Sequence, residues 1–373
     1  MTALRWLLIA HSSPGYESEF ENFSRFLSIK RPQDVVEVIG LPLGWRPHIG
    51  SVRGIVVGGQ LPDLRSYWVG APLHAVHEVA IPTRTRANIL IGFDPISVLH
   101  GRNCRSEVTV LWGIDFVPTR GNWFLDRVYR HLECRAMRLI DLQIENNAVA
   151  RDARQEACGV VPSRSSIVPI TIDTSMFAST PWSSSGLRLA FLGSLNKRTG
   201  AHRLLPILEA LRSLGVPASL DIIGGGPLIE ELRQQASSRG LDDQVEIHGF
   251  VEGDEQVAGI LSKCNVGLAP FSGEHGDFTW FADPQKIKLY LAAGLHVVTS
   301  DVPPIAMSVK EHGAGSLLGV NATNDEWAQH LKELSRSPER LALTQAHARN
   351  LARTFERSHA YDNVLEEVLE FVR

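Results

Sequence analysis

Short apolar runs that end in turn residues and give way to helix-like patterns recur along most of this chain. In the second half the runs cover residues 189–192, 220–223, 245–248, 266–269 and 297–299. A continuous apolar run of this length, bounded by turn residues, is typical of a strand buried on both faces of a parallel sheet. Helical patterns stand between the runs, such as the one that carries Leu204, Leu208 and Leu211. The alternation predicts an α/β fold with a doubly wound, Rossmann-like sheet.

The first half repeats this alternation less regularly. Its apolar runs cover residues 4–10, 35–41, 54–57, 89–92 and 108–112, and a helical pattern covers residues 17–27. Because 373 residues exceed the usual size of one compact domain, we expect two domains. Residues 179–186 are rich in Ser, Thr and Pro and lack periodicity, so they are predicted to link a domain at 1–178 to one at 187–350.

Composition and charge exclude several classes of function. The chain has 37 basic and 41 acidic residues and a formal net charge of −4, so it lacks the positive field that would bind nucleic acid. No apolar stretch approaches the roughly 20 residues that span a bilayer, and the first apolar run is too short for a signal peptide. These features predict a cytoplasmic protein. The four cysteines form no close pair, and we expect all of them to be reduced.

Small and basic residues follow three of the predicted strands in the second half. Gly193, Ser194, Lys197 and Arg198 lie in one loop, glycines 224–226 end the next strand, and a third strand runs into 249–251. Glycines let backbone N–H groups approach an anion, and two cations would neutralise a diphosphate. A solvated turn and tight glycine packing are the alternative explanations. Because ligands bind beyond the carboxyl ends of the strands in such sheets, these loops predict a phosphate-binding site.

Residues 276–294 contain the most informative local signal. Asp283 is predicted to be the N-cap of a short helix, with Pro284 in its first turn and Gly294 at its end. The N-terminus of a helix carries a partial positive charge and unpaired N–H groups, so together with Lys286 it would bind phosphate. A capped core helix with a surface lysine is the alternative.

The first half offers fewer candidates. Asp115 follows the strand at 108–112 and would bind a hydroxyl, act as a base, or cap the next segment. His11 follows the first strand and would bind a hydroxyl or a phosphate, or be an ordinary loop residue.

Residues 120–138 mix arginines with aromatic residues. We interpret them as a packed helix with a basic outer face, and peripheral membrane contact is the alternative.

Taken together, these segments resemble the donor-binding half of a GT-B glycosyltransferase, specifically of retaining family four (group 1). The resemblance is carried by Phe-Leu-Gly-Ser-Leu at 191–195, Asp-Ile-Ile-Gly-Gly-Gly-Pro at 221–227, Val-Glu-Ile-His-Gly-Phe-Val at 245–251 and Ala-Asp-Pro-Gln-Lys-Ile-Lys-Leu-Tyr-Leu-Ala-Ala-Gly-Leu at 282–295. It covers residues 187–345 and is looser in the first half, at 91–95 and 113–118. It implies two Rossmann-like domains that face each other across a cleft, with residues 351–373 returning as a helix to the first domain.

The resemblance also implies roles for single residues. The nucleotide diphosphate of a sugar donor would lie against the loop at 193–198 and the helix start, with its base near Phe250 and Val251. The implied donor-binding residues are Gly193, Ser194, Lys197, Arg198, Gly225, Phe250, Val251, Asp283, Pro284, Lys286 and Ile287. The implied acceptor-binding residues are His11, Gly15, Tyr16, Asp94 and Asp115. Retaining members are thought to use front-face chemistry, in which the leaving diphosphate helps to deprotonate the acceptor, and Lys286 and Asp115 would be the catalytic residues.

Two departures from the family pattern affect the site. The family's Glu-x7-Glu positions fall on Phe281 and Leu289, so no carboxylate is available at Leu289 to bind a ribose, although Glu274 and Asp277 lie nearby in the sequence. The usual Gly-Arg pair reads Gly193-Ser194, which moves the cationic role to Lys197 or Arg198.

The sequence as a whole predicts a glycosyltransferase. It would move a sugar from a nucleotide-diphosphate donor to a hydroxyl of a small molecule, glycan or lipid-linked glycan, without a metal and with retention. The chain contains no Asp-x-Asp, and no P-loop, serine hydrolase or zinc protease motif. No cofactor beyond the donor is expected, and UDP, GDP and the oligomeric state stay open. A GT-B epimerase or hydrolase and a non-catalytic nucleotide or sugar binder are the alternatives.

Overall fold

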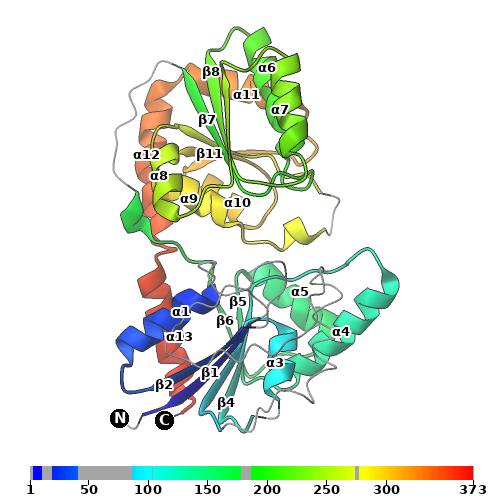
Figure 1. Cartoon of the computed structure of the whole chain (residues 1–373), viewed down its shortest axis with the longest axis vertical. Coiled ribbons are helices and arrows are strands. Elements are labelled where there is room, and N and C mark those ends of the chain that lie inside the picture. Colours follow the sequence, from blue (N-terminus) through cyan, green and yellow to red (C-terminus); the bar gives the residue numbers. More distant parts are fainter. Residues whose placement is uncertain are drawn as a thin grey trace. The chain divides into compact units, whose positions relative to one another are not determined.

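A computed structural model describes residues 3–10, 19–40, 86–102, 104–177, 186–273 and 277–372 of the chain. The chain divides into two compact units, Met1–Thr171 with Arg357–Arg373, and Ile172–Glu356 (Figure 1). Each unit contains a six-stranded parallel sheet with helices between its strands. The predicted α/β fold with two Rossmann-like sheets is therefore confirmed. The predicted strand at 54–57 and most of the predicted linker, residues 179–185, lie outside the described residues.

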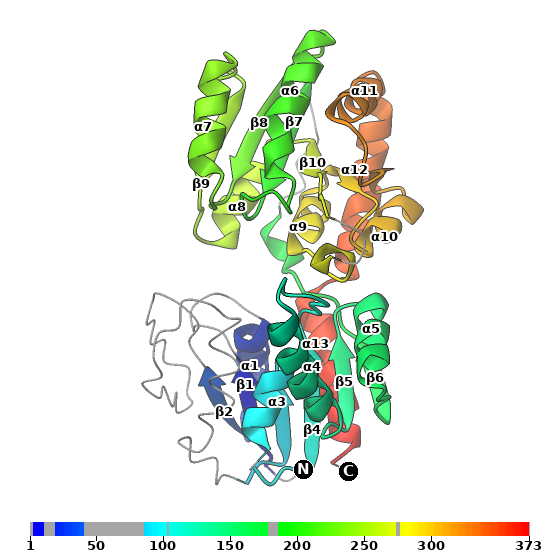
Figure 2. The same cartoon turned by 90° about the vertical axis from the view of Figure 1, so that its right-hand side faces the viewer.

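In the first unit the strand order is β2-β1-β3-β4-β5-β6. The strands are β1 (Arg5–Ala10), β2 (Val35–Gly40), β3 (Ile89–Gly92), β4 (Val108–Gly113), β5 (Leu142–Glu145) and β6 (Arg164–Ile167). The helices are α1 (Glu19–Lys30), α3 (Pro95–Gly101), α4 (Trp123–Met137), α5 (Ala148–Cys158) and α13 (Arg357–Glu370). α1 and α13 cover one face of the sheet, and α3, α4 and α5 cover the other (Figures 1 and 2).

The C-terminal helix α13 is part of the first unit's core. Its buried residues Tyr361, Val364 and Val368 belong to the same apolar cluster as Phe23 of α1 and Trp112 of β4. The ring of Tyr361 meets that of Phe23 edge to face, with the centroids 5.2 Å apart. Such aromatic pairs add to the free energy of burial, so the last helix is held by the core of the first unit although it follows the second unit in the chain.

In the second unit the strand order is β12-β11-β10-β7-β8-β9. The strands are β7 (Leu187–Leu192), β8 (Ala218–Ile223), β9 (Val245–Gly249), β10 (Val266–Ala269), β11 (His296–Ser300) and β12 (Gly315–Leu318). The helices are α6 (Leu204–Ser213), α7 (Ile229–Ser238), α8 (Asp254–Leu261), α9 (Gln285–Ala293), α10 (Ile305–Glu311), α11 (Asn324–Ser335) and α12 (Pro338–Arg353).

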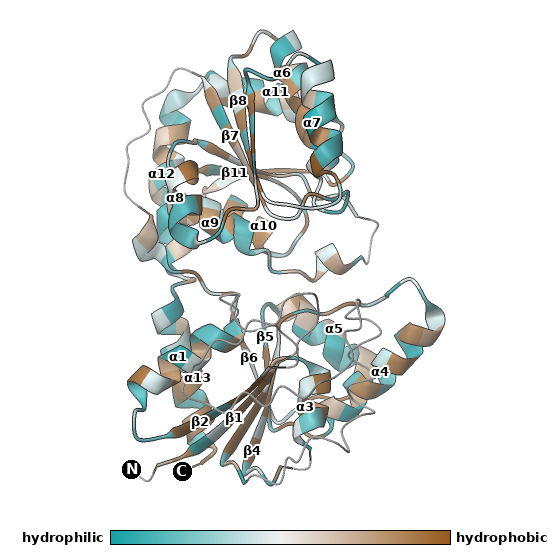
Figure 3. Ribbon diagram, in the orientation of Figure 1, coloured by the Kyte–Doolittle hydropathy of each residue, from teal (hydrophilic) through white to brown (hydrophobic). Residues whose placement is uncertain are grey.

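The strands of the second unit are hydrophobic on both faces, as the sequence pattern predicts. Alternate residues of β7 face opposite ways: Leu189 and Phe191 belong to the cluster under α6, α7 and α11, whereas Ala190 belongs to the cluster that contains α9 and α12. Figure 3 shows hydrophobic strands between helices whose hydrophilic residues lie on the outside. Helices on both faces explain why these strands read as continuous apolar runs. None of the described helices is long and apolar enough to cross a membrane.

The expectation that all four cysteines are reduced is wrong for two of them. Cys134 of α4 and Cys158 of α5 form a disulfide, with their Cα atoms 4.8 Å apart, whereas Cys104 and Cys264 are buried thiols. The two bonded residues are 24 positions apart in the sequence. Helix packing brings them together, because α4 and α5 lie side by side on the same face of the sheet (Figure 1).

Loss of this disulfide should destabilise the first unit. Closing a loop of this length restricts the unfolded chain by an amount worth about 3 kcal/mol. We expect the Cys134→Ser, Cys158→Ser double variant to lower the free energy of unfolding by roughly that amount, measured by urea unfolding under oxidising conditions. With dithiothreitol present, the wild-type protein and the variant should unfold alike. If neither the double substitution nor dithiothreitol changed the midpoint of urea unfolding, the disulfide would not contribute to stability.

Candidate functional site

The chain connections of the second unit reverse direction between β7 and β10. β7 leads to β8 and β9 on one side of the sheet, and β10 leads to β11 and β12 on the other. Open α/β sheets bind ligands at such a switch point, beyond the carboxyl ends of the two strands. Gly193 and Ser194 follow β7 there, and Pro270 and Phe271 follow β10. The predicted phosphate loop at 193–198 therefore starts at the place where a ligand is expected.

Lys286, in the first turn of α9, reaches this switch point. Its Nζ lies 4.3 Å from the ring centroid of Phe191 and 5.2 Å from that of Phe271. Gly193 faces the same amine, because a Cβ built at Gly193 would come within 3.1 Å of both Cε and Nζ of the lysine. The amine is therefore enclosed by the end of β7, the residues after β10 and the glycine loop.

The Lys286 amine has no hydrogen-bond partner among the described residues, although it is buried. Burial without a counter-ion disfavours the charged form and lowers the pKa of Lys286 to about 7. Nearby aromatic faces attract a cation only weakly compared with a carboxylate or a phosphate. An anion placed beside Nζ would supply the missing partner, so the geometry favours an anionic ligand here.

A second buried lysine on the same helix shows the contrast. Lys288 is fully buried, and its Nζ forms an ion pair with Asp283 and lies 4.8 Å from the ring centroid of Phe355. The predicted role of Asp283 as N-cap is wrong, because α9 begins at Gln285 with Pro284 as the N-cap residue and no side-chain cap. The Asp283 carboxylate instead compensates Lys288, and Lys286 is left for another partner.

The glycines after β8 pack against the loop after β7. Gly193 N–H donates to the Ile223 carbonyl at 2.8 Å, and Leu195 N–H donates to the Gly225 carbonyl at 2.8 Å. Gly224 and Gly226 have φ of 139° and 152°, and a Cβ on either would collide with the backbone of Gly193 or Leu195. Close packing explains these two glycines. Gly225 lacks such a conflict, since a Cβ there would meet only the Cβ of Phe250 at 3.9 Å.

The remaining predicted donor-binding residues lie in different environments. Ser194, Lys197 and Arg198 are exposed, and Arg198 forms an ion pair of 3.2 Å with Asp277. Phe250 is 74% exposed just past β9, and Val251 packs against the core beside it. Ile287 is fully buried in the core under α9. Leu289, at the position of the missing carboxylate, is also buried there, so its apolar character suits the packing of this helix.

Three residues beside β8 and β9 could ligate a metal ion. Asp221, Glu246 and His248 place one ligand atom each within 4.8 Å of one another, and His248 Nε2 lies 2.8 Å from Asp221 Oδ1. The hydrogen bond between this imidazole and carboxylate accounts for the contact without an ion. The absence of a metal stays a prediction.

The predicted acceptor-binding residues of the first unit do not form one described cluster. His11, Gly15 and Tyr16 lie outside the described residues. Asp94 caps α3, where its Oδ1 accepts from the N–H groups of Ile96 at 2.8 Å and Ser97 at 2.9 Å. Asp115 is exposed just past β4.

The sequence did not indicate the buried charges next to Asp115. Arg154, Glu133 and Glu145 come from α5, α4 and β5 and form two buried ion pairs. One signal was available: Glu145 ends an apolar strand, where a carboxylate needs a buried partner. The sequence alone does not identify that partner.

The predicted helix within residues 120–138 is present as α4. Trp123 and Phe124 at its start are 77% and 58% exposed. Arg127, His131, Arg135 and Arg138 are exposed along one side of the helix, as their spacing requires. Membrane contact through this face stays a prediction.

Residues 186–337 match the family model described as glycosyl transferases group 1. The match covers less than half of the chain and shows that this segment is similar to a glycosyltransferase group 1 domain. The segment contains the switch point, the glycine loops and Lys286. The resemblance found in the sequence is confirmed at this level, and the predicted enzyme class agrees with it. Assignment to retaining family four and the function of the Asp-Pro-x-Lys segment stay predictions.

Individual relatives cover the chain to different extents. It is 30% identical over 135 residues to the GDP-mannose-dependent alpha-(1-6)-phosphatidylinositol dimannoside mannosyltransferase of Mycobacterium tuberculosis. That alignment covers 34% of this chain and 34% of the relative. The chain thus matches only about a third of the relative's length.

Solved structures resemble the whole chain. Anabaena HepE in complex with UDP and glucose matches with a TM-score of 0.72 and 15% identity, covering 98% of this chain and 99% of that one. Sucrose-phosphate synthase from Thermosynechococcus elongatus matches with a TM-score of 0.73 and 12% identity, covering 99% of each chain. At these identities the likeness establishes a shared fold.

Replacing Lys286 should stabilise the ligand-free protein. In the Lys286→Met variant, a side chain of similar length removes a buried amine without a partner, and we expect the free energy of unfolding to rise by about 1–3 kcal/mol. The unfolded state binds more protons between pH 7 and 10.5, because burial lowers the lysine pKa from 10.5 to about 7. The wild-type protein should therefore gain stability across this window, and the advantage of the variant should shrink as pH rises. Thermal or urea unfolding from pH 7 to 10 measures both effects.

Lys288→Met is the matched control for this experiment. It removes the lysine of the same helix that forms an ion pair with the buried Asp283 carboxylate, so it should destabilise the protein. If both variants lost stability, Lys286 would have a stabilising partner in the free protein.

Proposed function

We propose that the protein transfers a sugar from a nucleotide-diphosphate donor to a hydroxyl acceptor. The observation that carries this proposal is the buried amine of Lys286 at the switch point, which has no hydrogen-bond partner in the described part of the chain. The sugar donor's diphosphate would lie between this amine, the loop at 193–198 and the first turn of α9. The N-terminus of this helix adds N–H groups and a partial positive charge to the same site.

Lys286 would stabilise the leaving group. Negative charge grows on the diphosphate as the bond to the sugar breaks, and an ammonium held in a dry site interacts with that charge more strongly than it would in water. The amine also has little freedom to lose, because Phe191, Phe271 and Gly193 enclose it. We propose a metal-independent reaction with retention, in which Lys197 and Arg198 supply the cationic charge at the outer edge of the site.

The names of the similar proteins favour two possible donor nucleotides, UDP and GDP. HepE was solved with UDP, and the mycobacterial relative is named for GDP-mannose. The exposed ring of Phe250, just past β9, would stack on either base. Leu289 offers no hydrogen bond to a ribose, so the backbone groups of the glycine loops would have to position the sugar of the nucleoside.

Asp115 is our candidate for the acceptor side of the reaction. It is exposed at the carboxyl end of β4, where a carboxylate can accept a hydrogen bond from a sugar hydroxyl. Asp94 would act on the acceptor side mainly by capping α3. A non-catalytic nucleotide binder is the second candidate, because Phe281 and Leu289 replace the two carboxylates of the family pattern.

Donor turnover separates these functions. We expect a panel of UDP and GDP sugars to release nucleotide much faster with a hydroxyl acceptor than by slow hydrolysis in water alone, and Lys286→Met to lower the rate with acceptor by about 10 to 100-fold, as for loss of a charge-assisted hydrogen bond. Equally fast release without acceptor would favour a hydrolase, and conversion of the donor sugar without net release of nucleotide would favour an epimerase. A melting-temperature shift with UDP or GDP, but no turnover over a broad acceptor panel, would favour the binder.

Nucleotide binding should weaken as pH rises above neutrality. Burial lowers the pKa of Lys286 to about 7 in the free protein, and a bound diphosphate favours the ammonium form and raises it again. The dissociation constant of a nucleotide sugar should therefore change little below pH 7 and rise by up to about tenfold per pH unit above it. Calorimetry at pH 8 in buffers of different ionisation enthalpy should show uptake of nearly one proton. Lys286→Met should abolish the uptake, whereas uptake that persists in this variant would assign it to another group.

A further inference from the structure

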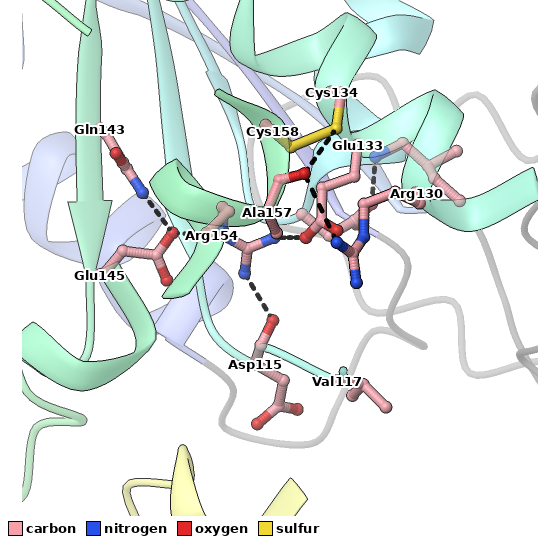
Figure 4. A network of polar contacts seen from close by, with 12 residues as sticks. Asp115, Val117, Arg130, Glu133, Cys134, Gln143, Glu145, Arg154, Ala157 and Cys158 are labelled. Carbon is pink, nitrogen blue, oxygen red and sulfur yellow. Dashed lines mark hydrogen bonds and ion pairs between the residues drawn. A yellow bond between two sulfur atoms is a disulfide. The ribbon is translucent and has the colours of Figure 1, made fainter. Parts of the chain in front are cut away.

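Arg154 occupies the centre of a buried ionic network in the first unit. Its guanidinium, about 1% exposed, donates to three acceptors, which lie on β5, on α4 and in the loop after β4 (Figure 4). Nε donates to Glu145 Oε1 of β5 at 2.6 Å, and Nη1 donates to Glu133 Oε1 of α4. Nη2 donates to the backbone carbonyl of Asp115, at 2.7 Å. This third hydrogen bond reaches a backbone carbonyl outside the two ion pairs, and it holds the loop after β4.

Every residue from 113 to 116 is held by a side chain or lies against one. A Cβ on Gly113 would come within 2.5 Å of both carboxylate oxygens of Glu145, so only glycine fits against this carboxylate. Asn146 Nδ2 donates to the Ile114 carbonyl, and the Phe116 ring centroid lies 5.4 Å from the Arg154 guanidinium carbon. Backbone carbonyls past a strand end have no ladder partner, and here side chains supply one for two successive residues.

Stability alone does not explain such a cluster. Two carboxylates share one guanidinium in a dry site, where burial raises the pKa of Glu145 and the charge of Arg154 opposes the rise. Buried ionic clusters of this kind are often no more stabilising than apolar residues of the same volume. The guanidinium fixes the relative positions of its acceptors. It is planar and rigid and donates to three acceptors in fixed directions, an arrangement that a lysine ammonium cannot reproduce.

The network fixes the backbone of Asp115 and leaves its side chain at the surface. Figure 4 shows the Asp115 carboxylate pointing away from Arg154. The Cys134–Cys158 disulfide joins α4 to α5 next to Glu133 and thus holds together the two helices that carry the network. The carboxylate is therefore presented from a loop whose position is set by α4, α5 and β5.

We propose that Arg154 is a positioning residue, which holds the loop of Asp115 so that its carboxylate meets the acceptor hydroxyl in one orientation. The inference rests on the proposed function. If Arg154 has this role, loosening the loop should impair sugar transfer to the acceptor. Nucleotide binding should be unaffected, because under the proposed function it depends on Lys286 in the other unit.

The test compares Arg154→Lys with Arg130→Lys in the full chain. Arg154→Lys keeps the charge and loses the three-way fork. Arg130 is a matched control on the same pair of helices: it lies on α4 and donates to the Ala157 carbonyl of α5 at 3.4 Å, without a bond to residues 113–116. Hydrogen exchange of the amides in residues 113–118 should become about tenfold faster in Arg154→Lys and stay unchanged in Arg130→Lys.

Kinetics supply the second readout. Arg154→Lys should lower kcat/KM for the acceptor by about 10 to 100-fold, while the melting-temperature shift with UDP or GDP and the slow hydrolysis of donor by water stay within about twofold of wild type. A general folding defect would lower all three. Should Arg154→Lys fail to fold, Glu133→Gln, which weakens one arm and keeps Arg154, should give a smaller change in the same direction.

Two results would overturn the proposal: unchanged exchange at 113–118, or faster exchange with an unchanged ratio of transfer to hydrolysis. If the wild-type protein neither binds nucleotide nor transfers sugar, the proposed function fails by itself. The exchange measurement still decides in that case whether Arg154 holds this loop.

Discussion

A buried amine with no counter-charge in the residues that the structure describes is the constraint on which the candidate site depends. Desolvation of Lys286 lowers its pKa to about 7, so the folded protein holds this group near the midpoint of its titration at neutral pH. A group of this kind weakens the fold unless a ligand compensates it, and natural proteins accept such costs mainly at functional sites. The strand order of the second unit explains why the cost falls there. The chain connections of the neighbouring strands β7 and β10 run to opposite sides at the switch point, and Phe191 and Phe271 at their ends lie beside the amine.

Two lysines on one helix show how position decides the role of the same chemical group. Lys286 and Lys288 are both buried in the first half of α9. Two residues along a helix turn a side chain to a different side, so one lysine faces the glycine loop and the other faces Asp283 and Phe355. The carboxylate of Asp283 compensates the second lysine, which turns it into a structural ion pair. The functional difference between the two therefore depends on which neighbour each one meets.

The sequence predicted features that depend on neighbours along the chain and missed those that depend on packing. Apolar runs located β7 to β11 to within a few residues, because most positions in strands covered by helices on both faces are apolar. Lys286 was found because a proline, a glycine and a buried face place it at the start of a helix. Asp283 was misassigned as a cap, because a polar residue just before a proline is typical of a helix start, whereas no local pattern shows its ion pair with Lys288. The Cys134–Cys158 bond and the three-way contacts of Arg154 join elements whose packing no local pattern specifies.

The two units hold their ligand loops by different physical means. In the second unit the loop after β7 is fixed by backbone hydrogen bonds to the glycines after β8, which need the absence of side chains to come so close. In the first unit the loop after β4 is fixed by the side chains of Asn146 and Arg154, which bond to successive carbonyls. Under the proposed function, the backbone N–H groups of the loop after β7 would contact the diphosphate, whereas the side-chain anchors of the loop after β4 leave the carboxylate of Asp115 at the surface. The two units would then differ in how they bind: the second an anion through backbone groups and Lys286, the first a hydroxyl through a single carboxylate.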